Sequence, residues 1–250
     1  MPNPLLVFDF DGVLVDGMAE YWWAARRAAL SLDPTLQLDT EPPAAFLRLR
    51  PLIHQGWEMV LVAAELGLPP SSDNLAFSRD YAGALAPTLH RRGWSAPLLQ
   101  RTLEQVRAEA IARDRRIWLD RHRFYPGIEA RLRRLASEGA DWGVLTTKGG
   151  AFAHEILAAA GLEPLFVHGH EQGSKPQVLQ RLQAMGRPLW FLEDRRPTLE
   201  AVRAQPALAA VRCYLVSWGY LAAQDHEGLQ AQGIHWLTPQ RFASPLADWP

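Results

Sequence analysis

Two aspartates near the start of the chain have the spacing of a catalytic or metal-binding pair. Asp9 and Asp11 close an apolar run of Leu, Val and Phe, which predicts a buried strand over residues 5–9 of a parallel sheet. Residues at i and i+2 of a strand point the same way, and Gly12 permits a sharp turn after them. Ligands of open α/β sheets bind beyond the carboxyl ends of strands, and paired like charges there favour a hard divalent cation. The alternative is an acidic turn without chemistry.

Polar groups also close two later apolar runs. One run ends in the hydroxyls of Thr146 and Thr147, and another ends in the adjacent acids Glu193 and Asp194. Threonine is common on strands, so the hydroxyl pair is weak evidence without its neighbours. The second acidic pair repeats the pattern of the first, again at the end of a strand.

The chain offers two lysines that could complete such a site. A cation near Asp9 would keep its carboxylate ionised and help to neutralise a bound phosphate. Lys175 precedes Pro176 at the start of a predicted helix, whose first amides also favour anions. Lys148 competes for this role because it follows Thr147. A solvated surface lysine is the alternative for each.

In their order along the chain these stretches resemble the motifs of the haloacid dehalogenase superfamily, whose members are mostly Mg²⁺-dependent phosphatases. Asp-Phe-Asp-Gly-Val-Leu-Val-Asp over residues 9–16 looks like the first motif, and the strand-end Thr146 like the second. Gly-Ser-Lys-Pro over 173–176 looks like the third, and Glu-Asp over 193–194 resembles the fourth in its β-phosphoglucomutase-like form. One departure is that many of these phosphatases carry a further aspartate about four residues later, where this chain has Pro and Thr at 197–198.

The resemblance implies a role for each residue. Asp9 would be the nucleophile that becomes phosphorylated, and Asp11 the general acid and base. Thr146 would hydrogen-bond the phosphoryl group, with the backbone amide of Thr147 as a further donor. Lys175 is favoured over Lys148 as the site lysine, because the following proline fits the family pattern. The implied Mg²⁺ ligands are carboxylate residues, namely Asp9, Asp11, Glu193 and Asp194.

Two kinds of element must position these groups. Helical spacing is expected over 18–32, 52–66 and 97–121, with short helices and loops over 71–97 and no strand between Phe10 and Asp141. After Tyr125 the pattern alternates. Strands are expected over 142–147, 165–168, 189–192, 211–216 and 233–237, and helices over 128–138, 151–160, 176–185 and 197–209.

Alternating strands and helices predict a doubly wound, Rossmann-like parallel sheet, with an all-helical cap inserted after the first strand. We expect a core domain of residues 1–16 and 124–250 and a cap domain of residues 17–123. The resemblance implies the same α/β architecture, like that of phosphoglycolate phosphatase relatives. Substrate choice should lie in the cap, where Arg50 beside Pro51 is a candidate to bind an anionic group of the substrate. A solvated arginine is the alternative.

Composition limits the partners. A formal net charge of −1 over 250 residues offers no global field for nucleic acid or for an anionic membrane. The single cysteine, Cys213, suits a reducing compartment, and no apolar run reaches the roughly 20 residues of a membrane span. We expect a soluble cytoplasmic protein, monomeric or homodimeric, with a small phosphorylated substrate.

The predicted function is a Mg²⁺-dependent phosphatase that acts on a small phosphorylated metabolite through an aspartyl-phosphate. A phosphomutase on the same core is the first alternative. A haloacid dehalogenase needs no metal and lacks the second acid of the first motif, so Asp11 and the acids at 193–194 count against it. A non-catalytic binding or regulatory protein of the same fold is disfavoured by the intact set of site residues.

Overall fold

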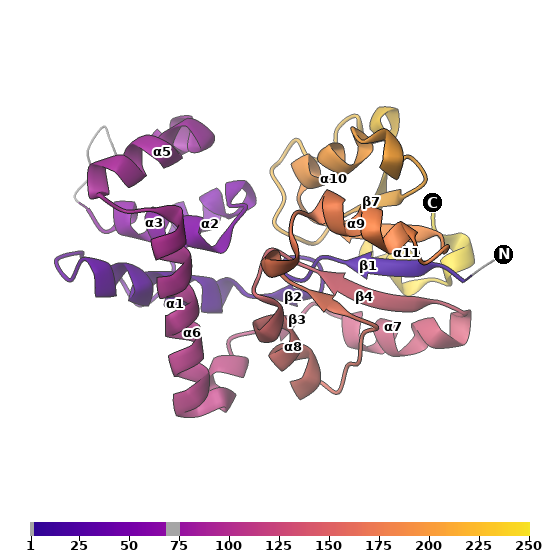
Figure 1. The fold of residues 1–250 in the computed structure, drawn as a ribbon, viewed down its shortest axis with the longest axis horizontal. Helices are drawn as coiled ribbons and strands as arrows, with labels where there is room; N and C mark the ends of the chain where they lie inside the picture. Colours follow the sequence, from indigo (N-terminus) through magenta and orange to yellow (C-terminus); the bar gives the residue numbers. More distant parts are fainter. Residues whose placement is uncertain (1–2, 69–75) are drawn as a thin grey trace. The chain divides into compact units, whose positions relative to one another are not determined.

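The computed structural model describes residues 3–68 and 76–250. The chain divides into two compact units, one made of Met1–Asp16 with Arg123–Pro250 and the other of Gly17–His122. We call them the α/β unit and the helical unit. Figure 1 shows their ribbons in sequence colours.

The α/β unit is built on a six-stranded sheet of order β5-β4-β1-β6-β7-β8, in which each neighbouring pair is parallel. Its strands are β1 (Leu5–Phe8), β4 (Asp141–Leu145), β5 (Val167–His168), β6 (Leu189–Glu193), β7 (Arg212–Val216) and β8 (Ile234–Leu237). The first strand of the chain thus lies between β4 and β6. Both of these neighbours follow it by more than a hundred residues in the sequence. This order brings the carboxyl ends of the three motif-bearing strands to one edge of the sheet.

Helices cover both faces of this sheet. They are α7 (Ile128–Leu135), α8 (Gly150–Ala159), α9 (Lys175–Gln183), α10 (Arg196–Arg203) and α11 (Pro239–Ala243). Leu5 and Val7 of β1 pack in one buried cluster with α9 and α10, and Figure 1 shows these two helices on the side of β1 opposite α7. Phe8 points to the other face, with its ring centroid 6.3 Å from that of Phe242 on α11. The fully apolar strand is therefore explained by burial on both sides.

The helical unit consists of α1 (Met18–Leu32), α2 (Ala44–Leu49), α3 (Gly56–Leu66), α4 (Ala76–Arg79), α5 (Tyr81–Arg92) and α6 (Ala96–Leu119). Helices α1, α3 and α6 pack against one another. The helix expected from residue 52 begins later, because Gln55 and Glu58 form a capping box and residues 50–52 form a separate 3₁₀ turn.

Two further expectations for this region need correction. Only short helices and loops were expected over 71–97. Residues 69–75 lie outside the described part, and in the remainder α5 is a regular 12-residue helix. Pro87 lies inside α5, and a proline within a segment counts against a helix in the sequence. Helix α6 has non-helical backbone angles at Asp114, so its last turn is kinked away from the rest.

Another correction concerns strands. None was expected between Phe10 and Asp141, yet β2 (Val15–Asp16) pairs antiparallel with β3 (Arg123–Phe124). Two residues are too few to show the alternation that marks a strand. This ribbon stands where the chain leaves the α/β unit and where it returns.

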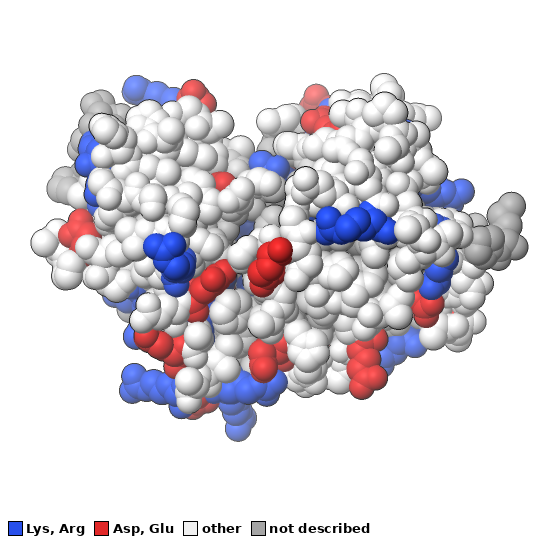
Figure 2. All heavy atoms as spheres, viewed as in Figure 1, with Lys and Arg blue, Asp and Glu red and all other residues white. Residues whose placement is uncertain are grey.

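The expected fold class is confirmed: a parallel α/β sheet with an inserted helical unit. On the face shown in Figure 2, Lys and Arg side chains are interspersed with Asp and Glu, in keeping with the near-zero net charge. Within the described ranges, no helix is both long and apolar enough to cross a membrane.

Candidate active site

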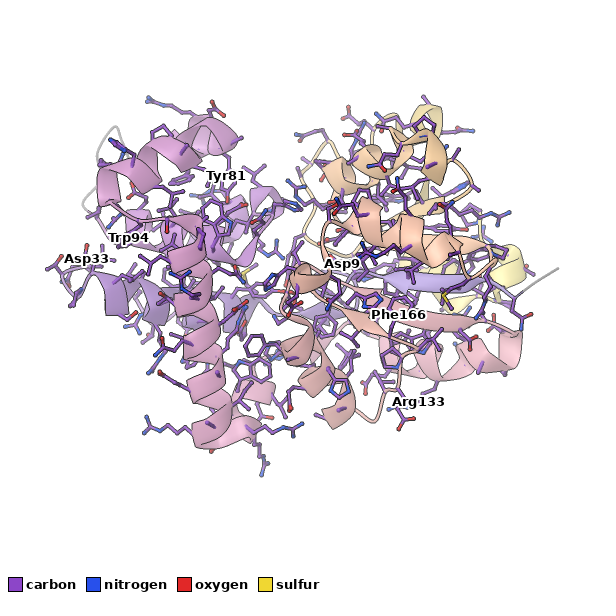
Figure 3. The ribbon with its side chains drawn as sticks, viewed as in Figure 1. Asp9, Asp33, Tyr81, Trp94, Arg133 and Phe166 are labelled. Carbon is purple, nitrogen blue, oxygen red and sulfur yellow. The ribbon has the colours of Figure 1, made fainter. Side chains whose placement is uncertain are left out.

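Asp9 stands directly at the carboxyl end of β1, where Figure 3 labels it. Its amide donates to the carbonyl of Leu192 at 2.8 Å, which continues the pairing of β1 with β6 for one more residue. The side chain is buried, 6% exposed. The parallel sheet therefore fixes this carboxylate through its backbone on a strand neighbour.

Lys175 reaches this carboxylate from the first residue of α9. Ser174 and Gln177 form a capping box that sets the start of the helix. The Lys175 Nζ lies 2.8 Å from Asp9 Oδ1 and donates to Glu193 Oε2 at 2.6 Å. The ammonium thus joins the acid that ends β1 to the acid that ends β6.

These three buried charges perturb one another. Burial, and then the Glu193 charge, raise the pKa of Asp9 to about 7 against the opposing effect of Lys175. Burial also raises the pKa of Glu193. For Lys175, burial favours the neutral amine, but Asp9 and Glu193 outweigh it and raise the pKa above that of a free lysine. The lysine is therefore charged, and two acids share its single positive charge.

A third acid completes a set of carboxylates that fits a divalent metal ion. Asp9, Glu193 and Asp194 each offer a carboxylate oxygen, and these oxygens lie within 4.8 Å of one another. All three residues are buried. Three carboxylates beside one ammonium leave an excess of negative charge, and oxygen donors of this kind suit Mg²⁺. Both oxygens of Glu193 already accept hydrogen bonds, from Lys175 and from the amide of Arg195.

Asp11 faces a different lysine. Its two carboxylate oxygens accept from Lys148 Nζ at 3.3 and 3.5 Å, and it is not a member of the three-carboxylate group. Its predicted role as a metal ligand stays a prediction. Each candidate lysine has its own carboxylate partner, because Lys175 pairs with Asp9 and Lys148 with Asp11. The assignment of Lys175 as the site lysine stays a prediction.

Thr146 directly follows β4, the other neighbour of β1 in the sheet. Its amide donates to the carbonyl of His168, and its hydroxyl accepts from the amide of Lys148 at 3.1 Å. Thr146 is buried and Thr147, next along the chain, is half-buried. The expected hydroxyl is thus at the same edge of the sheet as Asp9.

Sequence reasoning missed the loop that follows β7. The amide of Tyr220 donates to Asp194 Oδ2 at 2.7 Å, and the Tyr220 hydroxyl donates to Asp16 Oδ1 at 2.6 Å. The loop passes close to Gly12, where a built Cβ would lie 1.9 Å from Asp194 Oδ2. The available signal was the glycine at 219, in the loop that follows β7.

Arg50 belongs to the helical unit and is not among the residues that the α/β unit brings together. Its guanidinium lies over the ring of Tyr21, 4.9 Å from the centroid, and it donates to the carbonyl of Ile53. Its role in substrate binding stays a prediction.

Comparison with known proteins agrees with this geometry. The family model for haloacid dehalogenase-like hydrolases matches residues 4–204. None of the curated proteins matches the chain.

The chain is similar in fold to several solved structures. A predicted phosphoglycolate phosphatase of Haemophilus somnus is 16% identical with a TM-score of 0.61, covering 96% of this chain and 94% of its own. A predicted phosphatase of Clostridium acetobutylicum is 14% identical with a TM-score of 0.62, covering 95% and 94%. A hydrolase of Pseudomonas syringae is 16% identical with a TM-score of 0.56, covering 94% and 92%.

Proposed function

The chain belongs to the haloacid dehalogenase-like hydrolases, and from that premise we propose that it is a Mg²⁺-dependent phosphatase of a small phosphorylated metabolite. The observation that carries the proposal is the convergence of Asp9, Lys175, Glu193 and Asp194, all buried, at the carboxyl ends of β1 and β6. A carboxylate nucleophile beside a cation and a metal-binding set is what phosphoryl transfer needs. Phosphatase names among the structural neighbours are consistent with it.

In the first step, the Asp9 carboxylate attacks phosphorus, forming an O–P bond as the bond to the leaving oxygen breaks. Asp11 gives its proton to that oxygen, so that a neutral alcohol departs. In the second step, Asp11 takes a proton from water, which attacks the aspartyl-phosphate and releases inorganic phosphate. Asp9 is regenerated as a carboxylate.

The surrounding residues neutralise and orient the phosphoryl group. Lys175 and Thr146 hold its oxygens, and the amide of Thr147 is a further donor. Asp9, Glu193 and Asp194 would hold a Mg²⁺ ion, which would supply positive charge to the transferring group. The helical unit serves as the cap that selects the substrate.

Trapping the covalent intermediate tests this mechanism. The enzyme is incubated with a panel of phosphomonoesters and Mg²⁺, inorganic phosphate is measured, and the acid-quenched protein is reduced with borohydride for peptide mass spectrometry. A phosphorylated aspartate would be reduced to homoserine at position 9. In Asp9→Asn, turnover should fall by more than about a thousandfold, the scale of losing a nucleophile.

The matched control is Asp248→Asn, because Asp248 is an exposed aspartate of the same unit. It should keep wild-type turnover and the adduct at position 9. Turnover by Asp9→Asn close to wild type, or an adduct at a different residue, would contradict the mechanism. Transfer of the phosphate to a second position of the substrate, without release, would identify a phosphomutase.

A further inference from the structure

The loop after β7, residues 217–221, contacts the segment that follows the proposed nucleophile. Trp218 Nε1 donates to the carbonyl of Val13 at 2.9 Å. A Cβ built at Gly12 would lie 2.9 Å from Cδ2 of Tyr220, so the tyrosine ring covers this glycine. Two aromatic residues of the loop, one on each side of Gly219, therefore contact the turn that carries Asp11.

Close backbone approach makes this arrangement possible. A Cβ at Gly219 would lie 2.3 Å from the Cβ of Asp194 and 2.4 Å from the carbonyl oxygen of Gly12. Such distances exclude any side chain there. The glycine brings the next amide, that of Tyr220, to 2.7 Å from Asp194 Oδ2. This hydrogen bond fixes the orientation of the Asp194 carboxylate.

The hydroxyl of the same tyrosine binds elsewhere. It donates to Asp16 Oδ1 at 2.6 Å, across 204 residues of sequence. Asp16 pairs with Arg123 in the β2–β3 ribbon, where the chain leaves and re-enters the α/β unit. One half-buried residue thus contacts a candidate metal ligand with its amide and, with its side chain, the last residue of the chain's first segment in the α/β unit.

We propose that Tyr220 is a positioning residue that couples the segment Gly12–Asp16, through its hydrogen bond to Asp16, to the orientation of the Asp194 carboxylate. Its catalytic consequence rests on the proposed function. The coupling itself is a property of the metal-free protein, so the two can fail separately.

The first test is Tyr220→Phe, which removes only the hydroxyl. Gly12, Leu14 and Val15 have amides that bond within their own turn at 2.9–3.0 Å. Hydrogen exchange of metal-free protein should become several-fold faster over residues 12–16 and 217–221. Mg²⁺ affinity, measured by calorimetry, should fall roughly threefold to tenfold, the scale of one lost hydrogen bond. Saturating Mg²⁺ should restore most of kcat.

Tyr214→Phe is the matched control. Tyr214 lies on β7 of the same unit, and its hydroxyl donates to the carbonyl of Pro250 at 3.0 Å, away from the site. This variant loses the same atom and the hydrogen bond to Pro250. It should bind Mg²⁺ as the wild type does and leave exchange over residues 12–16 unchanged.

Variants of Asp16 test the pair directly. Asp16→Asn keeps an acceptor oxygen for the tyrosine hydroxyl and should behave nearly as wild type, whereas Asp16→Ala should match Tyr220→Phe. In the double variant Asp16→Ala/Tyr220→Phe, hydrogen exchange and Mg²⁺ affinity should change no more than in either single variant. Both substitutions remove the same hydrogen bond.

Three outcomes decide the matter. Wild-type exchange and Mg²⁺ affinity in Tyr220→Phe would overturn the proposal, as would effects in the double variant that multiply. If the wild type binds no Mg²⁺ and releases no phosphate, while Tyr220→Phe still loosens residues 12–16, then the coupling stands and the proposed function falls.

Discussion

The charge balance around Lys175 distinguishes this site from an ordinary salt bridge. One ammonium contacts both Asp9 and Glu193, and Asp194 lies in the same group of carboxylates. Burial and the Glu193 charge raise the pKa of Asp9, whereas burial and the Asp194 charge raise the pKa of Glu193. A buried site with more acids than cations is the kind of site that a divalent ion would fit, in keeping with the Mg²⁺ site proposed above.

A contrasting residue is Cys213, on β7 and fully buried. Burial raises the pKa of its thiol to about 11, against the opposing effect of Arg203. At pH 8 this lowers the thiolate fraction by roughly two hundredfold relative to an exposed thiol of pKa about 8.5. We expect a disulfide reagent to leave the native protein unlabelled and to label one thiol rapidly in urea. Rapid stoichiometric labelling of the native protein would contradict the burial.

The same shift predicts a pH dependence of stability. The folded state holds the thiol proton more tightly than the unfolded state, so this contribution to the free energy of unfolding is complete below about pH 8.5. It is lost as the pH rises through about 11. Urea unfolding between pH 8 and pH 10.5 should show the decrease, and Cys213→Ala, the control, should lack this component.

Among the elements, the short loop after β7 orients one of the site carboxylates. Parallel strands deliver their terminal residues to one edge of the sheet, but each side chain there still needs an orientation. The loop supplies it for Asp194 through the amide of Tyr220. Gly219 is required for steric space, because Asp194 and the carbonyl of Gly12 occupy the volume of any side chain.

Gly219→Ala should therefore displace the loop. We expect at least about a tenfold loss in Mg²⁺ affinity, since both the Asp194 contact and the Gly12 turn must shift. Affinity is measured by calorimetry, with circular dichroism to show a retained fold. Gly161→Ala is the control. Its Cβ would meet nothing within 4 Å, so at a φ of +62° it should cost stability alone. Wild-type Mg²⁺ affinity in Gly219→Ala would refute the steric argument.

At the scale of the whole molecule, each of the two units has its own interior. The helical unit buries an ion pair between α1 and α6, in which Arg107 Nε and Nη2 each donate to an oxygen of Glu20 at 2.8 Å. Neither side chain is more than 2% exposed. Trp118 Nε1 also donates to Glu20 at 3.4 Å. The two hydrogen bonds of this pair join α1 to α6 in a defined geometry.

Arg107→Ala should strongly destabilise the helical unit. The substitution leaves the Glu20 carboxylate buried without the positive charge of Arg107. Breaking a buried pair in this way lowers the free energy of unfolding by about 3–5 kcal/mol. Urea unfolding followed by circular dichroism and tryptophan fluorescence should show an early transition of this unit, because two-unit proteins need not unfold in one step. Arg101→Ala, at an exposed position of the same helix, is the control. Equal stability of the two variants would show that the pair contributes little.

Much of this molecule is specified by local sequence. Apolar runs that end in Asp9, Thr146 and Glu193 predict buried parallel strands with polar termini, because burial on both faces requires continuous apolar residues. Helix α1 has the predicted bounds, since its apolar residues follow the helical period. The fold class and the strand-end positions of Asp9, Thr146 and Glu193 are predictable for this reason.

Tertiary structure alone decided which groups meet. Local pattern favours Lys175 over Lys148 but does not give the partner of either, and they pair with Asp9 and Asp11 across 166 and 137 residues of chain. Tyr220 contacts Asp16 across 204 residues, and Arg107 contacts Glu20 across 87. Local periodicity encodes which face of an element is buried. It carries no information on which distant side chain lies opposite, because that depends on the order of strands in the sheet and on how each loop returns.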